Sequence, residues 1–302
     1  MQTPELRITS HVSLPGSTLL LALTGWMDGG LVSTGTVTRL MENRPVVKVA
    51  SINPDPFYIF NYPGTMEIAA MFRPAVKYVD GLTDGSLDWP TNEFHADPAA
   101  NLAFFIGCEP NLRWQAFADC IFAAAGELGV KRIIFIGSFG GTVPHTREPR
   151  MFGSVSHVHL QKTLKENGVR LSDYEGPAGF SSLLLSQAPT HNMEMLSLVA
   201  EIPGYLQGMN PLSIEAVTRR LAKLLGVPVN FDAMRAASNA WEAEFTKRVE
   251  KNDKLAATVR KLEEGYDNEL IKRAQEQPSM RSGFGAPWSV QMRPIGLVER
   301  TP

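Results

Sequence analysis

The chain has 302 residues, with 29 basic and 31 acidic side chains and a formal net charge of −2. This near balance argues against a general nucleic-acid binder, which carries a basic excess. Hydrophobic residues make up 44% and charged residues 20% of the chain, as in a folded globular protein and unlike a disordered one.

The sequence also bears on location. No apolar run approaches the roughly 18 residues that a membrane helix needs. The N-terminal stretch MQTPELRITS has neither the basic nor the apolar region of a secretory signal. The two cysteines, Cys108 and Cys120, are too few for a disulfide scaffold and lack the spacing of a zinc site. We therefore expect a cytoplasmic protein.

Short apolar runs rich in branched residues alternate with helical patterns. Several runs are nearly continuous, as in strands buried on both faces of a parallel sheet. Spacings of three and four residues predict helices over Trp114–Leu128, which Asn111 would cap, and Pro211–Leu225, with Asn210 as N-cap. This alternation predicts a layered α/β domain with a mainly parallel sheet. The expected strands are Leu19–Leu23, Val46–Ile52, Ala75–Val79, Leu102–Ile106, Arg132–Ile136, Val169–Ser172 and Glu194–Ile202.

The helix ends and the C-terminal quarter of the chain complete the predicted organisation. Gly129, Gly168 and Gly226 each follow a helical pattern, where a left-handed C-cap is expected. After about residue 230 the pattern predicts one long amphipathic helix, or two helices broken near residues 252–253. We predict a core domain over 1–232, a helical extension over 233–276 and an extended tail over 277–302.

A glycine-rich turn follows the first expected strand. Its members are Gly25, Trp26, Asp28, Gly29 and Gly30. Such a turn lets the backbone approach an anion at a helix N-terminus. However, the GxxxGG spacing fits neither a dinucleotide fingerprint nor a P-loop. A tight turn that places Asp28 near the positive end of a helix explains it equally well. This turn lies at the carboxyl ends of the expected strands, where ligands bind in parallel sheets.

The stretch 137–148 is the densest candidate site. Ser138 follows a strand, and His145 and Arg147 could hold a carboxylate or phosphate. The GxSxG pattern of a nucleophile elbow is absent, and no acid is placed to orient His145. Arg147 could equally brace its own loop. We therefore predict no catalytic triad, and Asp28 and Glu175 are the only evident acid–base candidates.

Two further groups of residues are candidate sites. His157 and His159 would share one side of a strand, but no acidic residue or cysteine completes a metal site nearby, so we predict no metal. Proline-punctuated aromatic segments occupy residues 53–63 and 85–94. Their rings could form a protein interface or cover the sheet edge as a satellite core, and we favour the interface.

Seven motifs, in order over residues 18–232, carry a family resemblance. They resemble the prokaryotic branch of the proteasome assembly chaperone 2 family. The motifs are Gly25-Trp26-x-Asp28-Gly29-Gly30, Asn53-Pro54-Asp55-Pro56-Phe57 with Asn61-Tyr62-Pro63, Gly107-Cys108-Glu109-Pro110 with Arg113-Trp114, Pro144-His145-Thr146-Arg147, Tyr174-Glu175-Gly176-Pro177-x-Gly179, Pro203-x-Tyr205, and a helix that ends in LLGVPV.

The resemblance implies a three-layer α/β/α fold similar to that of purine nucleoside phosphorylases, and a homo-oligomer such as a trimer. Eukaryotic relatives are heterodimeric chaperones of proteasome α-ring assembly. Some archaeal relatives engage proteasome rings through a C-terminal hydrophobic–tyrosine–any-residue motif. The present sequence ends in VERTP, so docking of this kind through the tail is not expected. A phosphorylase-like fold does not by itself imply phosphorylase activity.

We therefore predict a non-catalytic, oligomeric protein that binds partner proteins, namely itself and an unknown protein, but neither nucleic acid nor a membrane. No cofactor is predicted. The alternative is a small-molecule-binding protein or enzyme for a nucleoside-, phosphate- or carboxylate-bearing ligand at the carboxyl edge of the sheet. The candidate ligand-binding residues are Gly25, Trp26, Asp28, Gly29, Gly30, Ser138, His145, Arg147 and Glu175.

Overall fold

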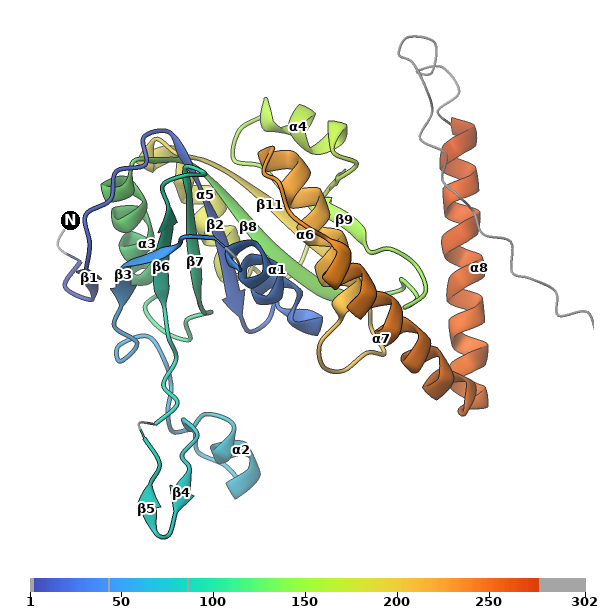
Figure 1. Ribbon diagram of the computed structural model, residues 1–302, viewed down its shortest axis with the longest axis horizontal. Helices are drawn as coiled ribbons and strands as arrows, with labels where there is room; N and C mark the ends of the chain where they lie inside the picture. Colours follow the sequence, from blue (N-terminus) through green and yellow to red (C-terminus); the bar gives the residue numbers. More distant parts are fainter. Residues whose placement is uncertain (1–2, 43, 86, 277–302) are drawn as a thin grey trace, which may run out of the picture. The chain divides into compact units, whose positions relative to one another are not determined.

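The computed structural model describes residues 3–42, 44–85 and 87–276. Eleven strands and eight α-helices lie in this part of the chain (Figure 1). The strands are β1 Leu6–Ile8, β2 Ser17–Thr24, β3 Val47–Ile52, β4 Tyr78–Val79, β5 Leu82–Thr83, β6 Glu93–Asp97, β7 Leu102–Cys108, β8 Val130–Gly141, β9 Arg150–Gly153, β10 Arg170–Leu171 and β11 Glu194–Pro203. The α-helices are α1 Val32–Met41, α2 Met66–Ala70, α3 Trp114–Leu128, α4 Leu160–Glu166, α5 Phe180–Gln187, α6 Pro211–Leu225, α7 Asp232–Glu250 and α8 Asp253–Glu276, and the short 3-10 turns are Gly29–Leu31 and Ala188–His191.

Nine strands form one mixed sheet in the order β1-β3-β6-β7-β2-β8-β11-β9-β10. The central strands β7, β2, β8 and β11 are parallel to one another. On one side, β6, β3 and β1 each run antiparallel to the preceding strand in the sheet. On the other side, β9 is antiparallel to β11, and β10 is parallel to β9. The prediction of a mainly parallel sheet is therefore right for the centre and wrong for the margins. Only the central strands are continuous apolar runs, which the two helical layers bury on both faces.

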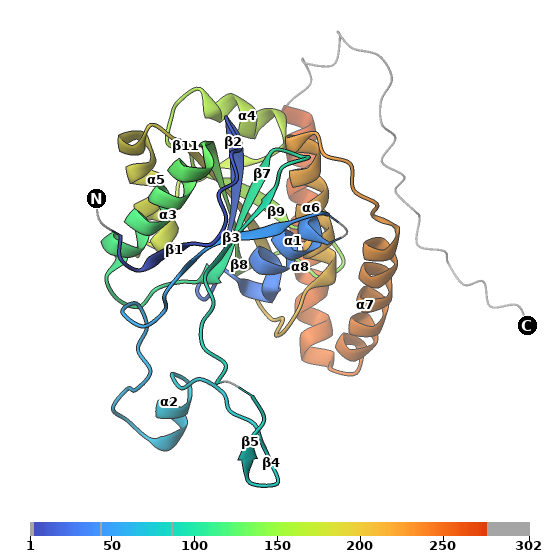
Figure 2. The ribbon, with the colours of Figure 1, turned by 60° about the vertical axis from the view of Figure 1, so that its left-hand side comes forward.

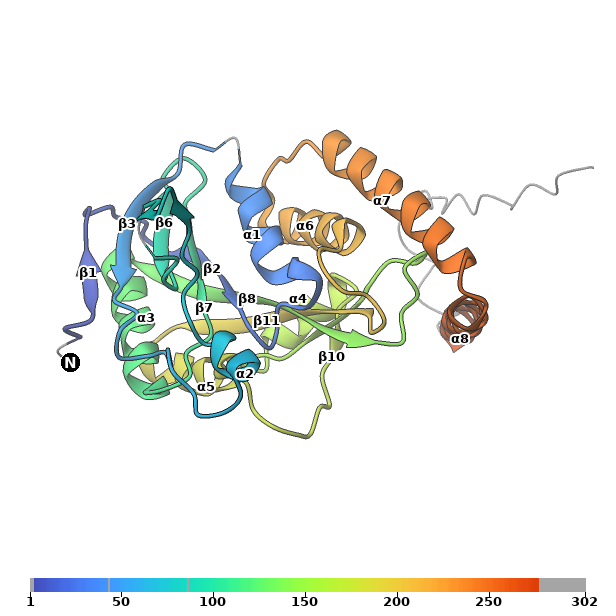
Figure 3. The same cartoon turned by 90° about the horizontal axis from the view of Figure 1, so that it is seen from below.

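Helices cover both faces of the sheet (Figure 3). Helices α3 and α5 pack on one face, where Phe117, Ile121 and Phe180 join a core cluster. Helices α1 and α6 pack on the other face, with Val37 and Val217 in a second cluster. The α/β architecture is thus as expected, while the likeness to phosphorylases stays a prediction.

The expected strand over 75–79 is wrong. Residues 78–79 instead pair with 82–83 in a small antiparallel ribbon, β4–β5, which is exposed and separate from the main sheet. The sequence patterns do not predict strands β1, β5, β6 and β9. Strand β8 continues to Gly141, so the first residues of the predicted loop over 137–148 are strand.

The predicted helix ends are confirmed except for one cap. Asn210 Oδ1 accepts the backbone N–H of Ser213 at 3.0 Å, as an N-cap should. Asn111 does not cap α3, because its Oδ1 accepts the N–H of Ile59 at 3.1 Å instead. The three predicted glycine C-caps, Gly129, Gly168 and Gly226, all have positive φ angles.

The C-terminal pattern forms two helices, α7 and α8. The break lies at Asn252, whose Oδ1 accepts the N–H of Leu255 at 3.1 Å at the start of α8. The chain divides into two compact units between residues 263 and 264. The domain boundaries predicted from sequence stay a prediction, and the expected tail over 277–302 lies outside the described residues. Within the described part of the chain, no helix combines the length and apolar character needed to cross a bilayer.

Candidate functional site

The glycine-rich turn after β2 caps helix α1. The Asp28 carboxylate accepts hydrogen bonds from the backbone N–H of Thr34 at 3.1 Å and from its hydroxyl at 2.7 Å. Burial raises the pKa of Asp28, and the bonds from Thr34 partly oppose this rise. The sequence allows two interpretations of this turn, an anion site or a tight turn with Asp28 near the start of a helix. The structure agrees with the second, because the Asp28 carboxylate accepts a backbone N–H that has no partner within the helix.

Ser138 closes this turn against the sheet. It is fully buried, its hydroxyl donates to the Gly29 carbonyl at 2.7 Å, and its N–H donates to the Met27 carbonyl at 2.8 Å. A Cβ on Gly30 would lie 2.9 Å from a carbon of Asn210. Protein atoms thus fill the space beside the turn, and its backbone forms no open cradle for an anion.

Glu109 joins two loops at the carboxyl ends of the strands. Its carboxylate accepts the N–H of Trp26 at 3.2 Å and that of Phe180, the first residue of α5, at 2.9 Å. Gly25 lies against it with φ +117°, and a Cβ there would approach Glu109 Cβ to 3.1 Å. The carboxylate and the glycine together set the position of the Trp26 backbone.

Replacing Glu109 with alanine is expected to lower the free energy of unfolding by about 1–3 kcal/mol, because two backbone N–H groups lose a charged acceptor. Urea unfolding measures this change. The matched control is Glu127→Ala on the exposed side of α3, which is expected to stay within about 0.5 kcal/mol of the wild type. Equal stability of the two variants would contradict a bridging role for Glu109.

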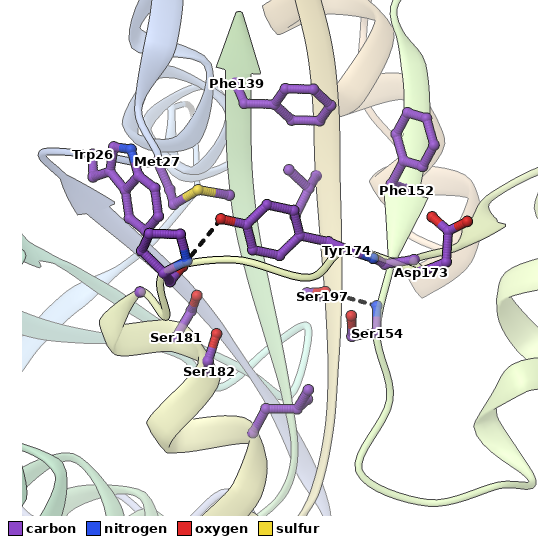
Figure 4. A pocket seen from close by; sticks show the side chains of 16 residues that line it. Trp26, Met27, Phe139, Phe152, Ser154, Asp173, Tyr174, Ser181, Ser182 and Ser197 are labelled. Carbon is purple, nitrogen blue, oxygen red and sulfur yellow. Dashed lines mark hydrogen bonds between the residues drawn. The ribbon is translucent and has the colours of Figure 1, made fainter.

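A cavity of about 400 Å³ opens beside these loops (Figure 4). We call it the aromatic cavity, since Trp26, Phe139, Phe152 and Tyr174 all line it. Trp26 is the only one of the nine predicted ligand-binding residues in its lining. The other lining residues are Met27, Gly153, Ser154, Ser172, Asp173, Pro177, Gly179, Ser181, Ser182, Leu185, Ser197 and Val199.

Sequence reasoning missed most of this lining, although weak signals were present. Phe139 directly follows the candidate Ser138, and its side chain leaves the opposite face of the strand. Tyr174 opens one of the family motifs, and Ser181 and Ser182 lie in the first turn of α5. These residues come from three separate segments, so only the packing of α5 and β9 beside β11 brings them together.

His145 has a different environment, against α7. The Tyr205 hydroxyl accepts the N–H of His145 at 2.8 Å and lies 2.7 Å from Nδ1, while Nε2 lies 3.1 Å from the Thr246 hydroxyl. Since the Tyr205 oxygen accepts one bond, its own proton is available to Nδ1, which leaves Nε2–H to donate to Thr246. Burial lowers the pKa of His145, and the nearby Glu263 partly opposes this. The ring is therefore neutral and fully bonded.

This arrangement predicts a pH dependence of stability. Because the folded-state pKa of His145 is depressed, its contribution is complete above the ordinary value of 6.5 and is lost as the pH falls toward the folded-state pKa. The wild type should lose more unfolding free energy than His145→Gln between about pH 7.5 and about pH 5.5. Denaturant unfolding at both pH values checks this. Identical losses would contradict it.

The remaining predicted site residues do not join the aromatic cavity. Arg147 donates to the carbonyl of Thr146 at 3.1 Å and lies 3.8 Å from Glu263. Glu175 is exposed in the loop that follows β10. Among the described residues, no group of three or more His, Cys, Asp or Glu side chains is placed to hold a metal ion.

A second candidate site is a protruding segment, residues 61–85 and 87–91, which we call the arm (Figures 1 and 2). It contains α2, β4 and β5 and extends away from the sheet. Met66, Met71 and Leu82 are 83%, 79% and 75% exposed. Soluble monomers rarely present apolar side chains in such number on one segment. Other large apolar residues of the arm that are exposed are Tyr62, Ile68, Val76, Tyr78, Val79, Leu87 and Trp89.

The two aromatic segments noted in the sequence thus divide between core and surface. Phe57 and Tyr58, just before the arm, are buried in the core cluster, as the satellite-core alternative required. Tyr62 and Trp89, inside the arm, are exposed. At the base of the arm, the rings of Phe60 and Trp89 meet edge to face at 4.8 Å, which holds its two ends together.

The family model described as PAC2 matches residues 22–249. The chain belongs to the PAC2 family. The match begins near the end of β2 and spans the rest of the sheet apart from β1, together with the aromatic cavity, the arm and most of α7. The resemblance drawn from the seven motifs is confirmed.

Solved structures share the fold of this PAC2 protein. It is similar to the Mycobacterium tuberculosis protein of unknown function Rv2714, with a TM-score of 0.78, 22% identity and coverage of 91% of this chain and 93% of that one. It is also similar to the proteasome-assembly chaperone homologue Rv2125 of the same organism (TM-score 0.69, 26% identity, 80% and 99% coverage). A third match is Pyrococcus furiosus PbaB, an archaeal proteasome activator (TM-score 0.61, 19% identity, 81% and 98% coverage). No curated protein matches the sequence.

Proposed function

We propose that this PAC2 protein is a non-catalytic, oligomeric protein that binds partner proteins, and that the arm makes the contact between copies of the chain. The observation that carries the proposal is the exposure of Met66, Met71 and Leu82 on one protruding segment. Flexible methionines and aromatic rings are typical of surfaces that other proteins cover.

The state of the candidate catalytic groups supports a role without catalysis. Ser138 donates its hydroxyl proton to a backbone carbonyl, and the Asp28 carboxylate caps a helix. Both ring nitrogens of His145 have partners within the fold. A nucleophile or general base needs a group that is free to meet a substrate, and each of these groups is already engaged.

The descriptions of two similar structures indicate which partner to test first. One is a proteasome-assembly chaperone homologue and the other a proteasome activator. The proteasome is therefore the first external partner to test for this protein.

The alternative, a binder of small molecules, is favoured by one observation, the aromatic cavity. Among the described residues, its lining contains neither Lys, Arg nor His. This chemistry suits a phosphate- or carboxylate-bearing ligand poorly, since such anions are held by basic side chains.

Photo-crosslinking tests the proposed function. A benzophenone amino acid in place of Tyr78 in the arm is expected to attach to a second copy of the chain in the purified protein. The matched control replaces Val158, which is 79% exposed but lies outside the arm. Equal yields from the two positions would rule out the arm as the contact.

A further inference from the structure

The aromatic cavity has the size and lining of a small-molecule site. Its volume of about 400 Å³ lies within the range of 300–1,000 Å³ that is usual for ligand pockets. Four aromatic side chains from four segments surround it (Figure 4). Phe139 and Phe152 have ring centroids 5.9 Å apart at 55°, so their faces converge without stacking on each other. This arrangement leaves ring faces available to a flat ligand.

Three serine hydroxyls supply unused hydrogen-bonding groups. The hydroxyls of Ser154, Ser181 and Ser182 make no hydrogen bond within the described part of the chain, and all three line the cavity. Ser197, by contrast, is engaged, because its hydroxyl accepts the N–H of Ser154 at 2.9 Å. Figure 4 shows Ser181 and Ser182 side by side at the start of α5. A hydroxyl or amide group on a ligand could pair with them.

The charge of the lining decides the ligand class. Asp173 is the one charged residue that lines the cavity within the described chain. A carboxylate beside the cavity, with no basic side chain, disfavours an anion. Asp173 is itself exposed. It lies near Phe152, on the side of the cavity opposite Trp26 (Figure 4). An exposed carboxylate stays hydrated and attracts a cation only weakly. A neutral ligand fits this lining best.

Tyr174 lines the cavity, and its hydroxyl donates to the Pro177 carbonyl at 3.2 Å. This bond holds the ring across the cavity between Trp26 and Phe152, as Figure 4 shows. Tyr174 is 65% exposed, so ring contact with a ligand would remove apolar surface from water.

We propose that the aromatic cavity binds a neutral, two-ring aromatic or heteroaromatic small molecule that carries a hydroxyl or amide group. The rings lie among Phe139, Trp26 and Tyr174, and the polar group faces Ser181 and Ser182. This inference is independent of the arm. If the cavity binds no ligand, the proposed contact through the arm is unaffected, and the reverse also holds.

Three probes with the same ring system test the proposal: 2-naphthamide is neutral, 2-naphthoate is an anion and 2-naphthylmethylammonium is a cation. Saturation-transfer NMR with the full chain gives the three dissociation constants. The neutral amide is expected to bind at least about tenfold more tightly than either charged probe, which corresponds to 1.4 kcal/mol. Tightest binding by the anion or the cation, or binding by none of the three, overturns the proposal.

Variants locate the site. Ser182→Trp fills the cavity and is expected to abolish binding of 2-naphthamide, whereas Ser186→Trp, on the same helix but outside the lining, leaves it intact. The smaller change Ser181→Ala/Ser182→Ala preserves the packing and is expected to weaken binding about two- to tenfold. Unchanged binding in both Ser182→Trp and the double alanine variant places the probe elsewhere and overturns the assignment.

Discussion

Replacing Met66, Met71 and Leu82 with serine together is expected to convert the proposed oligomer into single chains. These side chains are the most exposed large apolar residues of the arm. Each contributes about 1–3 kcal/mol when buried at an interface, so losing all three weakens association more than about a hundredfold. Light scattering coupled to size-exclusion chromatography measures the mass of the variant and of the wild type.

The matched control for the arm variant is Val158→Ser, which also removes a largely exposed apolar side chain but lies before α4. It should keep the mass of the wild type. Circular dichroism should show all three proteins folded, because none of the altered side chains belongs to the core. An arm variant that keeps the mass of the wild type would contradict the assignment of the contact.

Phe117→Ala is expected to lower the free energy of unfolding by about 3–5 kcal/mol. Phe117 is fully buried and lies at the centre of an aromatic cluster. Its ring centroid lies 4.9 Å from that of Phe57, which precedes the arm, and 5.5 Å from that of Phe180, which starts α5 beside the aromatic cavity. One side chain thus supports both candidate sites, and its loss leaves a cavity under each.

Phe139→Ala provides the comparison for Phe117→Ala in urea unfolding. Phe139 is 38% exposed at the aromatic cavity, so its truncation should cost about 1 kcal/mol or less. A similar loss of stability in the two variants would show that the buried cluster is not what fixes the loops.

The central fold could be predicted because its signals are local. Strands β2 and β7 are continuous apolar runs, and Asn210 is followed by Pro211 at a helix start, so each segment specifies its own structure. Strand β6 has the sequence EFHAD, whose polar members lie between buried ones, and it depends on pairing with β3 and β7. The strand expected over 75–79 was wrong because the apolar residues of the arm have the composition of a buried strand. Composition alone does not show whether such residues pack in a core or lie at an interface.

The candidate sites could be predicted only in part, because they also depend on contacts between residues distant in sequence. The sequence drew attention to Trp26 and to the loop that begins at Tyr174, which do meet in the structure. It could not show that Ser138 points back to its own turn, or that His145 lies beneath α7. The direction of a side chain depends on strand register and on helix packing, which are set by contacts distant in sequence.

The rate at which dilute peroxide oxidises the methionines of the purified wild-type protein tests most directly whether another chain covers the arm. Oxidation to the sulfoxide follows exposure. Within a single chain, Met66 and Met71 are 83% and 79% exposed, against 51% for Met209, which lies outside the arm. We predict that Met66 and Met71 are oxidised more slowly than Met209, because a neighbouring copy covers them. Oxidation of both at least as fast as that of Met209 would contradict the account.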